Sequence, residues 1–189
     1  MDTTGFTLFE TAIGPCGVSW GERGIRSIAL PDAGVERTRA RLARSVVGIG
    51  EGPVPAQVLD AIDGISALLE GERADLSAVV IDLTAVAAFD RRVTEVARTI
   101  DVGETLTYGE VATRIGASSQ AREVGQALGR NRFPLVVPCH RVVAADGLGG
   151  FSAPGGTETK LAAARDRAPP RTRSDGPVLG PDNSPPAAF

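Results

Sequence analysis

The 189-residue sequence is poor in the residues that build metal sites, disulfide frameworks and membrane spans. Two cysteines and one histidine cannot complete a four-ligand zinc site without several carboxylates, so we expect no metal site. Two distant cysteines also exclude a disulfide framework. No stretch approaches the ~20 apolar residues of a membrane span, and the N-terminus MDTTGFTLFE lacks the features of a secretion signal. We therefore expect a cytoplasmic protein with no membrane partner.

An excess of positive charge is also absent. The formal net charge is −3, which argues mildly against non-specific nucleic-acid binding, so any such role must rest on a local basic patch. One such patch is present between positions 120 and 141, where the only acid is Glu123. The arginines of this segment are Arg122, Arg130, Arg132 and Arg141.

The N-terminal half mixes strand and helix patterns. Residues 6–31 alternate short β-like runs with Gly and Pro, which predicts an antiparallel meander. Helices are predicted over residues 34–45 and 55–69, the second with Val58, Ile62, Ile65 and Leu69 at helical spacing. The apolar run 78–83 predicts a buried strand. This half shows no cluster of chemically useful side chains, so we expect it to play a supporting role.

The second half is predicted to be mainly helical. A helix begins near Phe89, with Asp90 as a candidate cap, and its apolar face consists of Val93, Val96, Ala97 and Ile100. Two shorter helices are predicted over residues 108–115 and 119–130, separated by a break at Gly116. This outline is typical of a helix-turn-helix, although many such hairpins bind nothing.

These patterns predict an α/β (α+β) fold in three parts. Residues 1–84 form a small N-terminal domain with an antiparallel sheet and helices. Residues 85–167 form a mainly helical domain with the helix-turn-helix and an active-site loop. Residues 168–189 hold six of the 13 prolines and no periodic apolar pattern, which favours a disordered tail.

The run VVPCHRVV places the only histidine directly after Cys139. A thiol becomes a strong nucleophile when an imidazole or a helix N-terminus stabilises its thiolate, and Pro138 suits the first turn of a short helix. Residues 135–137 are expected to hold Cys139 at the end of a strand-like segment. Adjacent side chains point in different directions, so His140 would reach the sulfur through a water molecule.

Packing is the competing interpretation of this pair, because free cysteine is among the most buried residue types. Cys16 also follows a proline but has no base or basic cluster beside it, so we interpret it as structural. A cysteine hydrolase is a further alternative, but no residue identifies the third member of its triad.

The run PCHRV, preceded by FPLVV, resembles the active-site signature of the O6-alkylguanine-DNA alkyltransferases, also called methylated-DNA-protein-cysteine methyltransferases. The segments TYGEVATRIG, AREVGQALGRN and GGFSAPGG follow the order and spacing of that family. The resemblance covers roughly residues 87–165. A fainter likeness extends into the N-terminal meander.

The resemblance implies a role for each residue that matches the family pattern. Cys139 is the alkyl acceptor and His140 its water-linked base. Tyr108 contacts the guanine and helps to rotate the nucleotide, Arg122 fills the gap in the base stack, and Asn131 ties the second helix to the active-site loop. The substrate pocket is formed by Leu128, Pro134, Val142, Phe151 and Ser152. Without the resemblance, Tyr108 could be a packing residue, Arg122 a solvated arginine and Asn131 a helix cap.

The resemblance also implies a partner and a reaction. The partner is double-stranded DNA containing O6-alkylguanine, bound by a monomer through the minor groove, with Arg130 and Arg141 as further contacts. The damaged base is rotated into the pocket, and Cys139 takes the alkyl group in a single irreversible turnover that needs no cofactor. O4-alkylthymine is a second candidate lesion.

Two departures from the family pattern bear on this interpretation. The family has a glutamate that keeps the histidine basic, and Asp166 is the nearest acid here, one position early. Glu123 occupies a position where the family prefers small residues, so it can weaken DNA affinity. The alternatives are an alkyltransferase-like protein that binds lesions without repairing them and a regulator that reads a specific site. Such alkyltransferase-like relatives carry tryptophan in place of Cys139.

Overall fold

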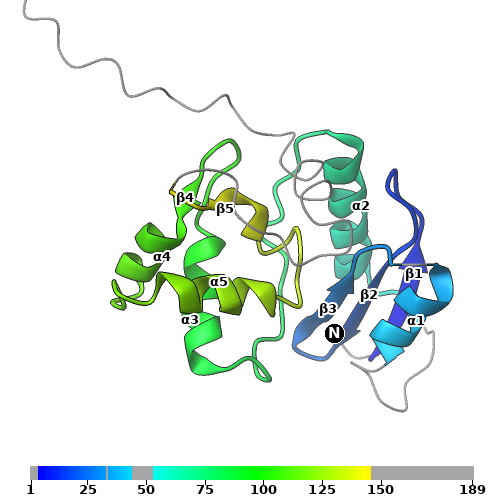
Figure 1. Cartoon of the computed structure of the whole chain (residues 1–189). Coiled ribbons are helices and arrows are strands. Elements are labelled where there is room, and N and C mark those ends of the chain that lie inside the picture. The colour runs from blue at the N-terminus through cyan, green and yellow to red at the C-terminus, as the bar shows by residue number, and fades with distance from the viewer. Residues whose placement is uncertain (1–3, 33, 44–52, 146–189) are drawn as a thin grey trace, which may run out of the picture.

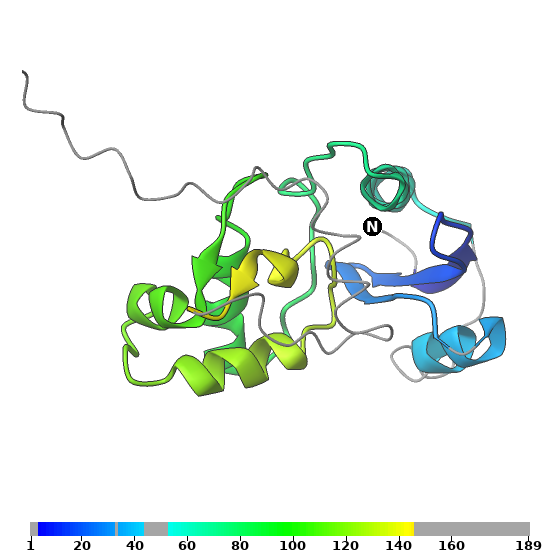
Figure 2. The ribbon, with the colours of Figure 1, turned by 45° about the horizontal axis from the view of Figure 1, so that its top comes forward.

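The computed structural model describes residues 4–32, 34–43 and 53–145 (Figure 1). The N-terminal part holds the sheet, and its strands are β1 (Gly5–Phe9), β2 (Cys16–Gly21) and β3 (Gly24–Ala29). They pair antiparallel in the order β1-β2-β3, which confirms the predicted meander. Helix α1 (Val35–Ala43) covers one face of the sheet and α2 (Ala56–Glu70) covers the other (Figure 2).

The second part is built on helix α3 (Ala88–Ala97) and the pair α4 (Tyr108–Arg114) and α5 (Ala121–Gly129). A 3-10 turn, η1 (Cys139–Arg141), leads into β5 (Val142–Val143), which pairs in parallel with β4 (Leu106–Thr107). The predicted helix pair and its break at Gly116, where φ is +71°, are confirmed. The fold is therefore the mixed α/β architecture that the sequence indicates.

Two predictions in this region are wrong. Residues 78–83 form no strand: Ile81 makes one isolated parallel bridge with Ile25, and Val80 is 57% exposed. Asp90 does not cap α3, because Ala87 occupies the N-cap position and Asp90 lies in the first turn.

Two large apolar clusters hold the molecule together. The first fills the space between the sheet and α2, and it includes Val18, Ile28 and Ile65. The second lies among α3, α4 and α5 around Val93, Val111 and Val124. Within the described ranges, none of the helices combines the length and the apolar character that a membrane crossing requires.

Backbone geometry at two glycines fixes connections in the N-terminal part. Gly71 ends α2 in the left-handed region at φ +91°, and its N–H donates to the carbonyl of Leu68. Gly24 begins β3 at φ +123°, where a built Cβ would lie 2.5 Å from the carbonyl oxygen of Val80. No atom lies within 4 Å of a Cβ built at Gly71. A substitution at Gly71 would therefore meet only the strain of a left-handed backbone, whereas one at Gly24 would meet both that strain and a steric clash.

The change Gly71→Ala should lower the free energy of unfolding by about 1–2 kcal/mol, the cost of a left-handed non-glycine residue. Gly24→Ala should lower it further, because the new methyl group must also displace the segment around Val80. Urea denaturation of the two variants measures the difference. If both variants lost the same free energy of unfolding, residues 79–82 would be able to move away from the new methyl group at no energetic cost.

Candidate active site

Helix α4 begins at Tyr108 because Thr107 and Glu110 form a capping box. The Glu110 N–H donates to Thr107 Oγ1 at 3.1 Å, and the Thr107 N–H donates to Glu110 Oε2 at 2.7 Å. These reciprocal bonds satisfy two backbone donors that a helix start otherwise leaves unpaired. They fix Tyr108 as the first helical residue, where its half-buried ring lies against the second apolar cluster.

The side chain of Asn131 connects the end of α5 with the cysteine. Its Oδ1 accepts from the Phe133 N–H at 2.9 Å, so Nδ2 must point the other way. Nδ2 lies 3.4 Å from the carbonyl oxygen of Val137 and 3.4 Å from Cys139 Sγ. A hydrogen-bond donor at this distance stabilises a thiolate over a thiol. Asn131 thus ties α5 to the cysteine turn.

Cys139 is the first residue of the 3-10 turn. Pro138 lies at the N-cap, one position before the first turn in which the sequence predicted it. The expected strand-like segment before it is absent: residues 134–137 form a turn, closed by the Val137 N–H donating to the carbonyl of Phe133 at 2.8 Å. Cys139 is 8% exposed, so its sulfur lies just beneath the surface. A tight turn, rather than a strand end, therefore presents the thiol.

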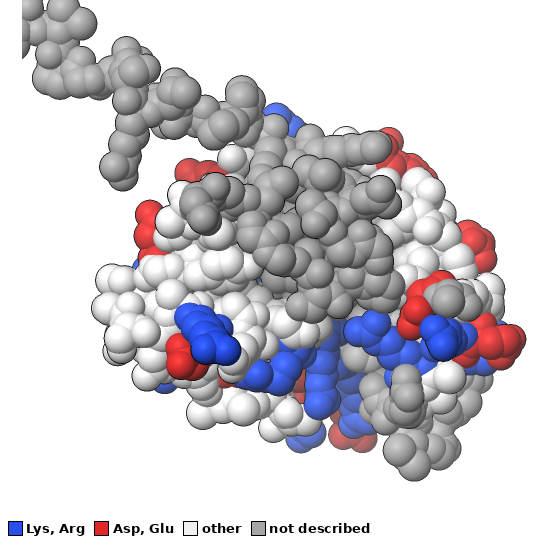
Figure 3. Space-filling model, in the orientation of Figure 1, with Lys and Arg blue, Asp and Glu red and all other residues white. Residues whose placement is uncertain are grey.

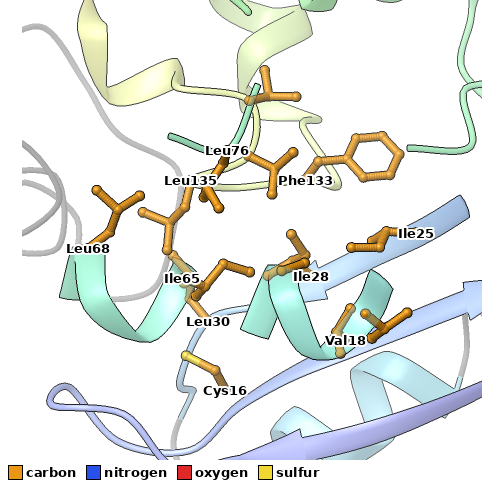
Figure 4. Packing of buried hydrophobic residues seen from close by; sticks show 14 of the residues in the cluster. Cys16, Val18, Ile25, Ile28, Leu30, Ile65, Leu68, Leu76, Phe133 and Leu135 are labelled. Atoms are coloured by element: carbon orange, nitrogen blue, oxygen red, sulfur yellow. The ribbon is translucent and has the colours of Figure 1, made fainter. Parts of the chain in front are cut away.

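Leu135 in this turn has φ +73°, a left-handed conformation that costs a non-glycine residue about 1–2 kcal/mol. Its side chain is 4% exposed and belongs to the first apolar cluster. Figure 4 shows Leu135 and Phe133 directed toward the core residues of α2 and β3. Burial of a leucine contributes about 1.5–3 kcal/mol, which is enough to offset the strain.

Two pKa shifts distinguish the surroundings of the two cysteines. Burial, and then the charge at Cys139, raise the pKa of Tyr108, so its hydroxyl stays protonated at neutral pH. Burial raises the pKa of Cys16 to about 11, against a hydrogen bond with Thr11 that lowers it. Cys16 therefore remains an inert thiol in the core of the N-terminal part.

The other predicted site residues differ in their exposure. His140 is 1% exposed, and Pro134 and Val142 are also buried. Leu128 is half-buried and packs against both apolar clusters. Arg122 is exposed at the second position of α5, and Glu123 is exposed beside it. Phe151, Ser152 and Asp166 lie outside the described residues.

Arg141 does not occupy the surface position expected of a DNA contact. Its side chain is buried, and Nη1 donates to the carbonyl oxygen of Ile100 at 2.8 Å. This bond satisfies a carbonyl just beyond the end of α3 and anchors the active-site turn there. Arg141 is thus corrected from a DNA-binding residue to an anchor of the turn.

Arg130 is exposed, but its guanidinium is held in a bidentate ion pair. Nε and Nη2 donate to the carboxylate of Asp90 at 2.9 Å and 2.8 Å. The hydrogen bonds from Arg130 lower the pKa of Asp90, which keeps this carboxylate ionised. The pair joins α5 to α3 and offsets the charge of Arg130.

Arg98, which no sequence pattern singled out, connects the two parts of the chain. This residue lies just after α3 and donates from Nη2 to the carbonyl oxygens of Ser77 and Val79, the latter at 2.9 Å. Sequence could not predict this contact, because the partners of Arg98 are backbone carbonyls in a loop about 20 residues earlier in the chain. In the ranges that the structure describes, no three His, Cys, Asp or Glu side chains form a group able to hold a metal ion.

Comparison with known proteins assigns the family. Residues 88–166 match the family model described as 6-O-methylguanine DNA methyltransferase, DNA binding domain. A methylated-DNA–protein-cysteine methyltransferase of Methanothermobacter thermautotrophicus is 37% identical over 145 residues, which cover 76% of this chain and 74% of that protein. The chain belongs to the methylated-DNA–protein-cysteine methyltransferase family. The enzyme of that name from Mycobacterium tuberculosis strain H37Rv is 42% identical over 95 residues, 50% of this chain and 56% of that protein.

Solved members of the family share the fold. The structure of Mycobacterium tuberculosis OGT in complex with DNA matches with a TM-score of 0.65 and 31% identity, over 84% of this chain and 90% of that chain. The O6-methylguanine-DNA methyltransferase of Pyrococcus kodakaraensis matches with a TM-score of 0.63 and 26% identity, over 87% and 98%. The α/β architecture described above is therefore that of the family.

Replacing Asn131 should slow the reaction of Cys139 with iodoacetamide. Asn131→Ala removes the donor to Sγ, and the loss of a hydrogen bond to a charged acceptor predicts a roughly 10- to 100-fold lower rate. Mass spectrometry of the peptide 133–141 measures this rate. Asn131→Asp is the matched control, because it keeps the acceptor for the Phe133 N–H but places a negative charge beside the sulfur. A wild-type rate in Asn131→Asp would remove this side chain from thiolate stabilisation.

The only tyrosine of the chain can be titrated by its absorbance without interference from another phenol. Because burial and then the charge at Cys139 raise its pKa, Tyr108 should ionise above its usual value of 10. Cys139→Ser removes the sulfur charge and should lower the midpoint, while the contribution of burial remains. An identical midpoint in the two proteins would show that Tyr108 does not sense Cys139.

Proposed function

We propose that this protein repairs DNA by transferring an alkyl group from O6-alkylguanine to Cys139 in one irreversible turnover. The observation that carries the proposal is the hydrogen bond from Asn131 Nδ2 to Cys139 Sγ, in a chain that belongs to this methyltransferase family. Packing alone does not require a side-chain amide to be oriented toward a thiol. A nucleophile does, because its anion needs a donor.

The chemistry balances without a cofactor. The Cys139 thiol gives its proton, through a water molecule, to His140, and Asp166 keeps that imidazole basic. The thiolate attacks the alkyl carbon in line, so that a sulfur–carbon bond forms while the bond from carbon to O6 breaks. The electron pair goes to guanine, which takes up a proton. The product is a thioether, so the protein is consumed by one repair event.

Access to the lesion requires that the nucleotide leave the base stack. Tyr108 at the start of α4 stays protonated, which is the form that can donate to the guanine ring while its bulk favours the rotated state. Arg122, exposed on α5, fills the vacated space. The base enters a pocket formed by Leu128, Pro134, Val142, Phe151 and Ser152. O4-alkylthymine is a further candidate substrate for this pocket.

The helix pair is proposed to bind the minor groove of the duplex as a monomer. That groove carries little sequence information, which suits a protein that must find lesions in any context. Two features reduce the attraction for phosphate at this surface. Glu123 lies beside Arg122, and Asp90 offsets Arg130.

Incubation with a duplex containing O6-methylguanine should add one methyl group to the tryptic peptide 133–141, which carries Cys139. The peptide that contains Cys16 is the internal control and should remain unmodified, because its raised pKa keeps that thiol protonated. Mass spectrometry measures both peptides in one digest.

The variant Cys139→Ser should take up no methyl group under the same conditions. Tight binding of the lesion duplex with Cys139 left intact would contradict the proposal. It would favour instead a protein that holds damaged guanine without repairing it.

A further inference from the structure

Acids or burial offset several of the cations around α5, which leaves Arg114 of α4 and Arg132, just after α5, as exposed arginines of this region. Asp90 pairs with Arg130, Glu123 lies beside Arg122, and Arg141 is buried. Each phosphate that a cation neutralises contributes to affinity through counterion release, so a surface with few available cations binds weakly. A chain with a net charge of −3 needs cations from another part of the fold.

Helix α1 supplies such cations on the N-terminal part. It buries Thr38 and Leu42 against the sheet, and Leu42 packs with Phe6 and Ala29. Its three arginines alternate with other residues along the helix, and Glu36 is its only acid. They are Arg37, Arg39 and Arg41, of which the first and last are exposed and the second is half-buried. Arg37 lies 4.0 Å from Asp32 in an exposed ion pair, which is looser than the bidentate pair of Arg130 with Asp90.

The two helices lie on the same side of the molecule. In Figure 2, α1 and α5 lie along the lower side, whereas α2 lies across the sheet from α1. The connection between them is fixed by a backbone hydrogen bond from the Ile28 N–H of β3 to the carbonyl oxygen of Arg132, at 2.8 Å. Arg132 is exposed and follows α5, so it lies beside the strand on which α1 packs.

The basic side chains on this side form one surface. Figure 3 shows arginine side chains in a band that crosses the face from the part occupied by α5 to the part occupied by α1. Scattered, solvated arginines would be expected to alternate with acids over all faces of an acidic protein. A band that begins at the proposed DNA surface and continues across the sheet indicates one extended polyanion as its partner.

We propose that the arginines of α1 are a second DNA contact, which binds phosphates of the same duplex beyond the part held by the helix pair. This inference rests on the proposed function only in taking duplex DNA as the partner. It assigns a binding role to the N-terminal part, for which the sequence predicted only a supporting one. Contacts with phosphate carry no base information, so they add affinity at any sequence.

The test is the salt dependence of binding to an undamaged, fluorescently labelled duplex. The triple variant Arg37→Gln, Arg39→Gln, Arg41→Gln should bind more weakly than the unsubstituted protein. The slope of log K against log salt should become shallower by about 0.9 for each phosphate that the variant no longer neutralises. The weakening should appear on a long duplex and shrink on a short one that reaches little beyond the helix pair.

Arg73→Gln is the matched control for Arg37→Gln and Arg41→Gln as single changes. Arg73 is exposed and follows α2, which lies across the sheet from α1. The change Arg73→Gln removes the same charge as each single change. Because Arg73 lies away from the proposed surface, this change should leave the slope of log K against log salt unchanged. The rate of methyl transfer from O6-methylguanine supplied as a free base should be equal in all variants, because a free base has no phosphates for these arginines to bind.

Three results would overturn the inference. One is a triple variant with the slope and affinity of Arg73→Gln, and another is no binding of duplex by the unsubstituted protein. The third is a triple variant that loses only cooperativity, with an unchanged slope for the first copy bound, since that would place the arginines between copies. None of these depends on Cys139, so failure of alkyl transfer from the free base would count against the proposed function alone.

Discussion

The site depends on one side-chain amide that makes contacts in both directions. Asn131 accepts from the Phe133 N–H and, with its other end, reaches the carbonyl of Val137 and the sulfur of Cys139. Because the acceptor is fixed by the backbone, the donor has no freedom to turn away from the sulfur. The position of the Cys139 sulfur is therefore set by the side-chain bonds that link the residue after α5 to the cysteine turn.

That turn is held by packing from the N-terminal part of the chain. Leu135 adopts a strained backbone conformation, which its burial against the α2 and β3 core offsets. Beyond the cysteine, Arg141 fixes the turn to the carbonyl of Ile100, near the end of α3. Thus the cysteine turn bridges the two parts. The N-terminal part therefore supports the turn through the packing of Leu135 and Phe133 against its core.

Local patterns predicted the elements whose stability is local. The apolar spacing of α2 and α3, the break at Gly116 and the strand meander all appear in the structure. The predicted strand at 78–83 failed for a reason outside its own sequence. The free edge of β3 is divided: Ile25 pairs with the 80–82 segment, whereas the Ile28 N–H donates to Arg132. Only a short bridge can form on an edge that two distant segments share.

The same limit explains the arginines. A basic residue in an arginine-rich segment is expected at the surface, yet Arg141 and Arg98 use their guanidinium groups to satisfy loop carbonyls, and Arg130 pairs with Asp90. Sequence alone counts Arg130 and Arg141 among the cations available to DNA, whereas the fold engages both. Positive charge on this face therefore depends more on the exposed side chains of α1 than the motifs around α5 indicate. A band of cations on one face is the distribution that the proposed second DNA contact requires of a protein with a net charge of −3.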